Sequence, residues 1–361
     1  MKLADIIETF ISGDWGEETV AEDTPNSVFC IRGADIVPIT NHCFNGIPQR
    51  FVCDKTIENK TLKAGDLIIE KSGGSPTQST GRIVYVSEDL IKAKGNVVCS
   101  NFCTAFRVKA GWNPLYVYYF WQNVYNHGAF FNFEGKTSGI KNLQLDNALS
   151  AIDIEYLPLE KQNQIVTSLT SIDEKIKVNR QINDNLEAMA KQLYDYWFVQ
   201  FDFPNEEGKP YKSSGGAMMW NDKLKREIPQ GWSTLPISAI LDKYPTTKRY
   251  ETKEYLSQGK YPIIDQGDTY IVGYTNEDDN LLTRHPAVLF GDHSTKVKFL
   301  DFDFARGADG TQILYSSNDA VSQYYLYLAV STLQIPNPGY SRHFKYLKEL
   351  PIVIPSLSIS T

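Results

Sequence analysis

The side chains best suited to bind an anionic ligand lie in a segment rich in serine, threonine and glycine, residues 72–81. The segment lacks the G-x-x-x-x-G-K-S/T spacing of a nucleotide-phosphate loop. Its hydroxyls, amides and backbone N–H groups suit hydrogen bonds to a DNA backbone or to base edges. The predicted donors are Lys71, Ser72, Ser75, Gln78 and Arg82. A solvated hairpin loop without a ligand is the alternative interpretation.

Two further groups of polar residues are predicted to contact DNA. The first is the glycine-broken segment 134–141, in which Lys136, Ser138 and Lys141 can donate to phosphate. The second lies in the last third of the chain, where a loose echo of the first third places basic and polar side chains. These residues are His293, Ser294, Lys296, Arg342, His343 and Lys345.

Known catalytic motifs are absent from this sequence. It has no dinucleotide-binding G-x-G-x-x-G, Walker motif, H-E-x-x-H or G-x-S-x-G. It also lacks the N/D-P-P-F/Y tetrad of adenine methyltransferases and the acidic and lysine spacing of common nucleases. The 5 cysteines show no C-x-x-C spacing, which argues against a zinc site and a disulfide framework. We therefore predict no catalytic residue, no metal ligand and no directly bound cofactor.

The charge is unusual for a DNA-binding protein. The net charge is −7, although phosphate contacts from Lys and Arg supply most non-specific DNA affinity. Residues 60–141 are locally basic, so we expect basic surfaces on an acidic body and a partner that adds phosphate contacts. An acidic cytosolic protein that never binds DNA is the alternative. No apolar run approaches the roughly 18 residues of a membrane span, and no signal peptide is visible, so we predict a cytoplasmic protein.

A heptad pattern dominates residues 157–203. Residues at alternating spacings of four and three form an a/d seam, which predicts one long helix. Pro158 suits the start of this helix and Pro204 its end. From residue 160 to about 200 the helix would be roughly 60 Å long. The seam comprises Ile165, Leu169, Ile172, Ile176, Asn179, Asn183, Leu186, Ala190, Leu193 and Trp197.

The remaining elements suggest two related modules. We predict a short helix over residues 3–11, strands at 27–31, 51–54, 65–71 and 82–86, and a helix capped by Asn113 that begins at Pro114 and ends near residue 128. Residues 235–241, 290–297, 324–328 and 343–347 echo 3–11, the strand at 65, 116–120 and 139–143 in the same order. This order predicts two related modules joined by the long helix, which is called the rod below.

Part of the rod carries a family resemblance. The run P-L-E-x-Q at Pro158, the following I-D-E-K-I and I-N-x-x-L-E spacing, and the aromatic close Y-D-Y-W-F-V-x-F-D-F up to Phe203 resemble the central conserved helix of the DNA-specificity subunit of type I restriction-modification systems. Residues 227–232 resemble the start of that family's second target-recognition domain, and residues 65–84 resemble a strand pair of its first.

The resemblance implies an α+β fold, in which two target-recognition modules with mixed or antiparallel sheets and helices are joined by a long coiled-coil-type α-helix. The expected limits are 1–156 for the first module, 157–203 for the helix, 204–227 for a linker, 228–355 for the second module and 356–361 for the start of a distal region. It further implies a non-catalytic subunit that reads a bipartite duplex target and positions methyltransferase (M) and restriction (R) subunits. Those subunits would use S-adenosylmethionine, ATP and Mg²⁺. A coiled-coil adaptor that holds two ligand-binding modules apart without DNA is the alternative function.

We expect another helix or chain to pack on the apolar seam. In the family a second conserved helix packs on the first and follows an Ile-Pro-x-x-Leu sequence like residues 354–357, a few residues before Thr361. An exposed apolar stripe of this length is not expected on a stable monomer. We therefore predict that a second copy of the chain, a separate fragment bearing the distal helix, or the methyltransferase covers it.

Overall fold

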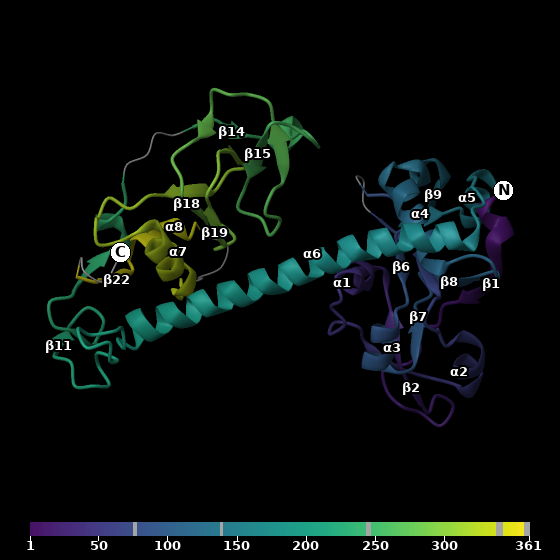
Figure 1. The fold of residues 1–361 in the computed structure, drawn as a ribbon, viewed down its shortest axis with the longest axis horizontal. Helices are drawn as coiled ribbons and strands as arrows, with labels where there is room; N and C mark the ends of the chain where they lie inside the picture. Colours follow the sequence, from purple (N-terminus) through teal and green to yellow (C-terminus); the bar gives the residue numbers. More distant parts are fainter. Residues whose placement is uncertain (75–77, 138–139, 243–246, 337–341, 357–361) are drawn as a thin grey trace. The chain divides into compact units, whose positions relative to one another are not determined.

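The computed structural model describes residues 1–74, 78–137, 140–242, 247–336 and 342–356. The chain divides into two compact units, Met1–Gln181 and Ile182–Thr361. The division falls inside the long helix α6, Leu159–Tyr194, which is drawn in teal in Figure 1. The long helix predicted from the heptad pattern is therefore confirmed, and a π-helical turn, Asp195–Val199, follows it.

The described part of the first unit holds three small sheets. The central one is antiparallel, with the order β1 (Ile7–Ser12), β8 (Cys103–Val108), β4 (Leu67–Glu70), β6 (Ile83–Tyr85). A mixed sheet has the order β3 (Gln49–Val52), β2 (Asn26–Ile31), β7 (Val97–Cys99), and β2 runs parallel to β7. The third has the order β5 (Ser72–Gly73), β10 (Ile140–Leu143), β9 (Glu134–Thr137). Every residue of β4 is buried, as its apolar run predicts.

Short helices with clear start signals cover these sheets. Ser87 Oγ accepts from Leu90 N at 3.2 Å, and Asn113 Oδ1 accepts from Leu115 N at 2.9 Å, with Pro114 in the first turn. The helix predicted from Asn113 and Pro114 is confirmed. The helices are α1 (Ile36–Thr40), α2 (Asp54–Lys60), α3 (Glu88–Lys94), α4 (Pro114–Asn126) and α5 (Leu145–Ala151).

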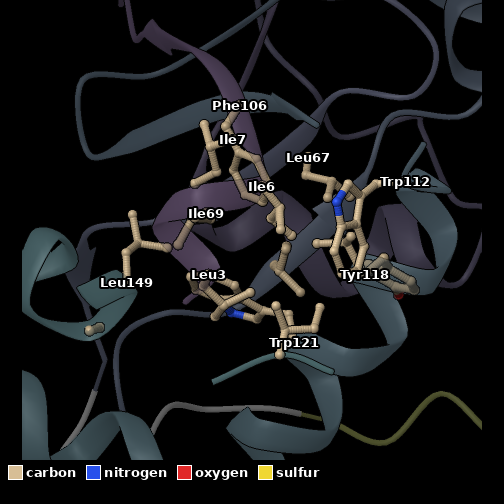
Figure 2. Packing of buried hydrophobic residues seen from close by; sticks show 14 of the residues in the cluster. Leu3, Ile6, Ile7, Leu67, Ile69, Phe106, Trp112, Tyr118, Trp121 and Leu149 are labelled. Atoms are coloured by element: carbon tan, nitrogen blue, oxygen red, sulfur yellow. The ribbon is translucent and has the colours of Figure 1, made fainter. Parts of the chain in front are cut away.

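The aromatic face of α4 forms the core of the first unit. Figure 2 shows Trp121 and Tyr118 from α4 beside Leu3 and Leu67 from other elements. The Trp121 ring stacks on Phe130 with centroids 4.7 Å apart, and its indole N–H donates to the backbone oxygen of Gly81 at 2.7 Å. The prediction that these aromatics are core residues is confirmed, because Trp121 is fully buried.

The prediction of a helix over residues 3–11 is wrong. A 3₁₀ turn at Leu3–Ile6 leads directly into β1, which pairs with β8 from Ile7↔Val108 to Ser12↔Thr104. Apolar residues at 3, 6, 7 and 11 fit a helix and also a turn followed by an edge strand, and the unpaired edge of β8 selects the strand. Residues 134–137 and 140–143 form β9 and β10, which pair antiparallel.

In its described part, the second unit combines small sheets with two helices besides the end of α6. Its described strands are β11 (Met218–Asn221), β12 (Arg226–Pro229), β13 (Ser233–Pro236), β14 (Arg249–Tyr250), β15 (Tyr261–Ile264), β16 (Gly273–Thr275), β17 (Leu281–Leu282), β18 (Ala287–Gly291), β19 (Val297–Leu300), β20 (Phe304–Gly307), β21 (Thr311–Leu314) and β22 (Pro351–Ile354). The helices are α7 (Gln323–Thr332) and α8 (Phe344–Glu349). Tyr194 and Phe198 from the end of the rod pack on Tyr325 of α7, with ring centroids 5.5 and 4.7 Å apart.

The two units share a strand topology. In the first, β4 lies between β6 and β8, and β2 runs parallel to β7. In the second, β18 lies between β19 and β21, and β15 runs parallel to β20. Each unit then adds an aromatic helix, α4 or α7. The predicted echo is incomplete, because residues 140–143 form a strand whereas residues 344–347 lie in α8, and because β1 pairs with β8 whereas β13 pairs with β22.

Candidate nucleic-acid interface

Three loops of the second unit meet at Gln266. They follow β15, connect β18 to β19, and connect β20 to β21. Gln266 Oε1 accepts from His293 N at 2.9 Å, its Nε2 donates to Asp309 O at 2.8 Å, and its backbone oxygen accepts from Ser294 Oγ at 2.6 Å. One side chain therefore fixes the relative positions of all three loops.

Asp292 attaches the start of α8 to the same cluster. Its backbone N donates to Gly310 O at 2.8 Å, its backbone oxygen accepts from His343 N at 2.8 Å, and its carboxylate accepts from Phe344 N at 2.7 Å. The His343 ring is 3% exposed, and its Nδ1 lies 3.0 Å from Asp292 O. His343, which was predicted to contact DNA, therefore positions the loops in this structure.

The turn between β20 and β21 needs glycine. Gly310 has φ +85°, and a Cβ there would lie 2.7 Å from both Gln266 Nε2 and His293 Cδ2. Both the backbone conformation and the space exclude a side chain. The close approach is what allows Asp309, one residue earlier, to stand beside the arginines described next.

Three arginines gather around Asp309. Arg249 Nη1 forms an ion pair with Asp309 Oδ1, and Arg342 Nη2 lies 3.8 Å from Asp309 Oδ2. Arg306 pairs with Arg249 across β14 and β20, is 7% exposed, and donates from Nη2 to Thr247 O at 2.8 Å. Burial lowers the pKa of Arg306, and its Nε lacks a partner among the described residues. The cluster thus has an excess of positive charge.

The sequence predicted part of this cluster. His293, Ser294, Arg342 and His343 come together, while Lys296 bonds Asp268 at 2.9 Å and Lys345 is exposed on α8 with its Nζ 4.6 Å from the Tyr346 ring. Sequence reasoning missed Gln266, Asp309, Arg249 and Arg306. They lie in three separate segments, and only the repeated strand order could have pointed to the loop after β15.

The first unit builds a groove from the corresponding three loops. Residues 32–34 follow β2, residues 71–74 follow β4, and residues 100–102 connect β7 to β8. A groove of about 540 Å³ is lined by residues 32–34, Ser72 and residues 100–102 of these loops, together with Trp15 and Glu70. Phe102 projects with 57% of its surface exposed, and Asn101 lies beside it. This groove is more apolar than the arginine cluster of the second unit.

An ion pair supports this groove from below. Glu70 accepts from Arg82 Nε at 2.8 Å and from Arg82 Nη2 at 2.6 Å, and these bonds raise the pKa of Arg82. Glu70 is 3% exposed. Cβ atoms on Gly33 and Gly73 would lie 2.5 and 2.6 Å from its Oε1, so both glycines are needed for the carboxylate to fit.

Some of the other first-unit residues that were predicted to contact DNA bond to residues of the same unit. Lys141 Nζ bonds Glu134 at 2.9 Å, and Ser72 Oγ bonds Asn142 Oδ1 at 2.5 Å. The backbone N of Lys71 donates to Phe102 O, and Gln78 is exposed. Ser75 and Ser138 lie outside the described residues, as does the side chain of Lys136 in β9. Arg82 and Lys141 therefore support the loops, and DNA contact by these residues stays a prediction.

Comparison with known proteins finds a domain family that part of the chain resembles. Residues 53–188 match the family model of the type I restriction modification DNA specificity domain. This part of the chain is similar to that domain family. It contains β4, β6, β8, α4 and most of α6, so the family match includes most of the rod and the part of the groove lined by Glu70, Ser72 and residues 100–102, but not the part lined by Trp15 and residues 32–34.

Two curated relatives are named as type I restriction enzyme specificity subunits. The chain is 29% identical over 119 residues to the type I restriction enzyme MjaIX specificity subunit of Methanocaldococcus jannaschii. The match covers 33% of this chain and 25% of that protein. It is 31% identical over 121 residues to the type I restriction enzyme EcoR124I/EcoR124II specificity subunit of Escherichia coli. That match covers 32% of this chain and 29% of that protein. The matches thus span about a quarter of each relative's length.

A solved structure supports the fold of the specificity domains. The S subunit of a type I restriction-modification system from M. genitalium aligns over 100% of this chain and 85% of that chain, with a TM-score of 0.51 and 13% identity. The α+β fold predicted from the sequence, with two modules and a long helix, is confirmed.

The heptad seam of α6 is largely exposed. Ile165, Ile172, Ile176, Leu186 and Leu193 expose between 38% and 58% of their surface. Leu169 is half-buried, and Asn179, Asn183 and Ala190 are exposed. Trp197 instead packs on the cluster around Phe201 and Trp232.

Sequence reasoning missed a second apolar line beside the seam. Val178, Ile182 and Met189 expose 47%, 50% and 62%. They continue to Leu186 and Leu193 at spacings of three and four, so the apolar face is wider than one a/d seam. Among the described helices, α6 included, none has the length and apolar character required to cross a membrane.

Proposed function

We propose that this chain is a DNA-specificity subunit of a type I restriction-modification complex. Each unit reads one part of a bipartite duplex target through its three-loop cluster, and the rod separates the two parts. The observation that carries the proposal is the repeated cluster: the same strand topology presents loops in both units, within a chain whose residues 53–188 match the specificity-domain family.

The different linings of the two clusters favour DNA reading over a purely structural adaptor. An adaptor needs no arginines gathered beside a single carboxylate, whereas duplex DNA is recognised by guanidinium groups and by apolar contacts to base edges. The second unit places guanidinium groups beside Asp309, and the first unit exposes the apolar side chain of Phe102. Two half-sites with different sequences follow from this difference.

Catalysis belongs to partner subunits in this proposal. The chain carries no known methyltransferase or nuclease motif, and its net charge of −7 leaves phosphate contacts for a partner to supply. Methyltransferase subunits would contribute S-adenosylmethionine chemistry, and restriction subunits would use ATP and Mg²⁺, in the cytoplasm. The exposed apolar face of α6 supplies a surface for assembly with a second copy, a distal-helix fragment or the methyltransferase.

Methylome sequencing tests the proposal. Cells that carry this gene with its neighbouring methyltransferase gene should show a split adenine-methylation motif that disappears when this gene alone is deleted. The same motif after deletion would contradict the proposal. Replacing residues 1–155 with the first module of a relative should alter one half-site only, and a change in both halves would contradict independent reading.

The purified chain provides a second test. It should show no methylation with S-adenosylmethionine and no cleavage with Mg²⁺, and it should gain tight, salt-sensitive binding to duplex DNA when its methyltransferase is added. Turnover by the isolated chain would assign catalysis to it and overturn the subunit role. Full assembly without any DNA binding would favour the adaptor.

A further inference from the structure

The side chain of Arg249 is held by a carboxylate and still faces solvent. Its Nη1 forms the ion pair with Asp309, and 47% of the side chain is exposed. Among the described residues Asp309 is the side chain that Arg249 bonds, so the Nε and Nη2 edge of the guanidinium has no protein acceptor. That edge presents two parallel N–H donors.

The position of Asp309 is itself tightly determined. Its backbone oxygen accepts from Gln266 Nε2, and the next residue is Gly310, whose φ of +85° and close neighbours exclude a side chain. Gln266 also bonds His293 and Ser294. The guanidinium of Arg249 is therefore attached to a carboxylate whose own backbone is fixed by three loops.

We propose that Arg249, positioned by Asp309, reads a guanine in the half-site bound by the second unit. Guanine presents the O6 and N7 acceptors side by side in the major groove, which matches a two-donor guanidinium edge. A phosphate offers a similar pair of oxygens. The ion pair with Asp309 favours a base over a phosphate as the ligand of Arg249. A fixed orientation of the guanidinium contributes to discrimination between bases, whereas attraction to a phosphate does not need one. This inference rests on the DNA-reading role proposed above.

The neighbouring arginines strengthen attraction to an electron-rich ligand. Arg306 is 7% exposed and has no carboxylate within ion-pair distance among the described residues. Arg342 shares Asp309 at 3.8 Å and is 69% exposed. Asp309 thus serves two guanidinium groups, and Arg306 lies on the strand beside Arg249 without a carboxylate of its own among the described residues; an incoming acceptor such as guanine O6 reduces that imbalance.

The corresponding turn of the first unit has different chemistry. Residues 100–102 connect β7 to β8 as residues 308–310 connect β20 to β21. Asn101 and Phe102 occupy that turn, and Phe102 is 57% exposed. The first unit therefore lacks a carboxylate-held arginine at this turn. The guanine contact is assigned to one half-site of the target and not to both.

A charge-preserving substitution tests the assignment. Arg249→Lys is expressed in cells with the methyltransferase, and the methylome is compared with that of the wild-type chain. We expect one guanine of one half-site to become degenerate, with discrimination falling about 5- to 150-fold, the range of one bidentate contact. Asp309→Asn should relax the same position to a smaller extent, because it removes the positioning carboxylate and retains the reader.

Arg284→Lys is the matched control. Arg284 forms a similar exposed ion pair, with Asp242 at 2.6 Å, but it precedes β18, whereas the loop cluster follows that strand. Its substitution should leave the motif unchanged. A uniform fall in methylation by Arg249→Lys with an unchanged motif would indicate phosphate contact, and an unchanged motif and rate would indicate no contact; both results overturn the guanine assignment.

A modified DNA provides a test that does not depend on folding of a variant. Replacing the assigned guanine by 7-deazaguanine removes the N7 acceptor while base pairing is retained. Binding by the wild-type complex should weaken, and binding by the Arg249→Lys complex should weaken less, because the ammonium lacks the planar two-donor edge that pairs with O6 and N7 together. Equal weakening of both complexes would overturn the assignment. Absence of any split motif with the wild-type chain would instead refute the proposed function itself.

Discussion

Gln162 holds the backbone of Asn113 at the position where α4 begins. Gln162 Oε1 accepts from Asn113 N at 2.8 Å, and its Nε2 donates to the backbone oxygens of Gly111 and Leu157 at 3.1 and 2.8 Å. The Gln162 side chain is fully buried. This is the glutamine of the P-L-E-x-Q run, so the motif has a structural reason: it attaches the first turn of the rod to the helix that forms the module's core.

Gln162→Ala should destabilise the first unit. The substitution leaves one backbone N–H and two backbone oxygens without their partner, and each such buried loss costs about 1–3 kcal/mol. Thermal unfolding followed by circular dichroism measures the effect, with the exposed Gln164→Ala as the control. Equal unfolding temperatures for the two variants would show that the rod is attached by other contacts.

Removing one partner of the Glu70–Arg82 pair should destabilise the first unit more strongly. Glu70→Gln leaves a largely buried guanidinium without its charge partner, and breaking a buried pair costs about 3–5 kcal/mol. The double variant Glu70→Leu, Arg82→Met should recover part of the loss, because it leaves no uncompensated charge. Denaturant unfolding compares the three proteins. A double variant less stable than Glu70→Gln would contradict this account.

Thiol labelling should separate the five cysteines by burial. Burial raises the pKa of Cys103 to about 11 and of Cys30 and Cys99 to about 12. Only the thiolate reacts, so at pH 8 a thiol with a pKa of 11 is ionised in about one molecule per thousand. A hydrogen bond with Thr56 lowers the pKa of Cys53, and Cys43 is exposed.

Iodoacetamide at pH 8 should therefore modify Cys43 and Cys53 in the folded chain, as measured by mass spectrometry of its peptides. Raising the pH should increase labelling of Cys103 before that of Cys99. Unfolding in guanidinium chloride should make all five react and serves as the control. Rapid modification of Cys99 in the folded chain would show that β7 is accessible.

The exposed apolar face of α6 should cause self-association of the purified chain at micromolar concentration. Leu186→Asp or Ile172→Asp should reduce the molar mass measured by light scattering, because each places a charge on an apolar interface. Ala188→Asp adds the same charge at an exposed position on the opposite side of the helix and should have little effect. A monomer that binds no hydrophobic dye would show that the face needs no cover.

Lengthening the rod should lengthen the unread spacer of the target. One heptad inserted into α6 adds about 10 Å of helix, or roughly three base pairs at about 3.4 Å each. The methylome of cells that carry the insertion measures the spacer, and a heptad replaced without change of length is the control. An active complex with its original spacer would show that α6 does not set the gap.

The sequence by itself determined the elements whose signals are local. The heptad spacing predicted α6, and Asn113 followed by Pro114 predicted the start of α4, because both depend on residues within a few helical turns. The aromatic residues of α4 were correctly assigned to the core, since an amphipathic helix carries its own burial pattern.

Tertiary structure decided the features that need a distant partner. Residues 7–12 form a strand because β8, about 100 residues later, offers an unpaired edge, and no local pattern excludes a helix there. The loop cluster of the second unit joins Arg249, Gln266, Asp292 and Asp309, which are separated by 17 to 60 positions in the chain. Neither spacing nor composition predicts that Gln266 bridges those loops, because its hydrogen bonds exist only once the parallel pairing of β15 and β20 brings the strand ends together.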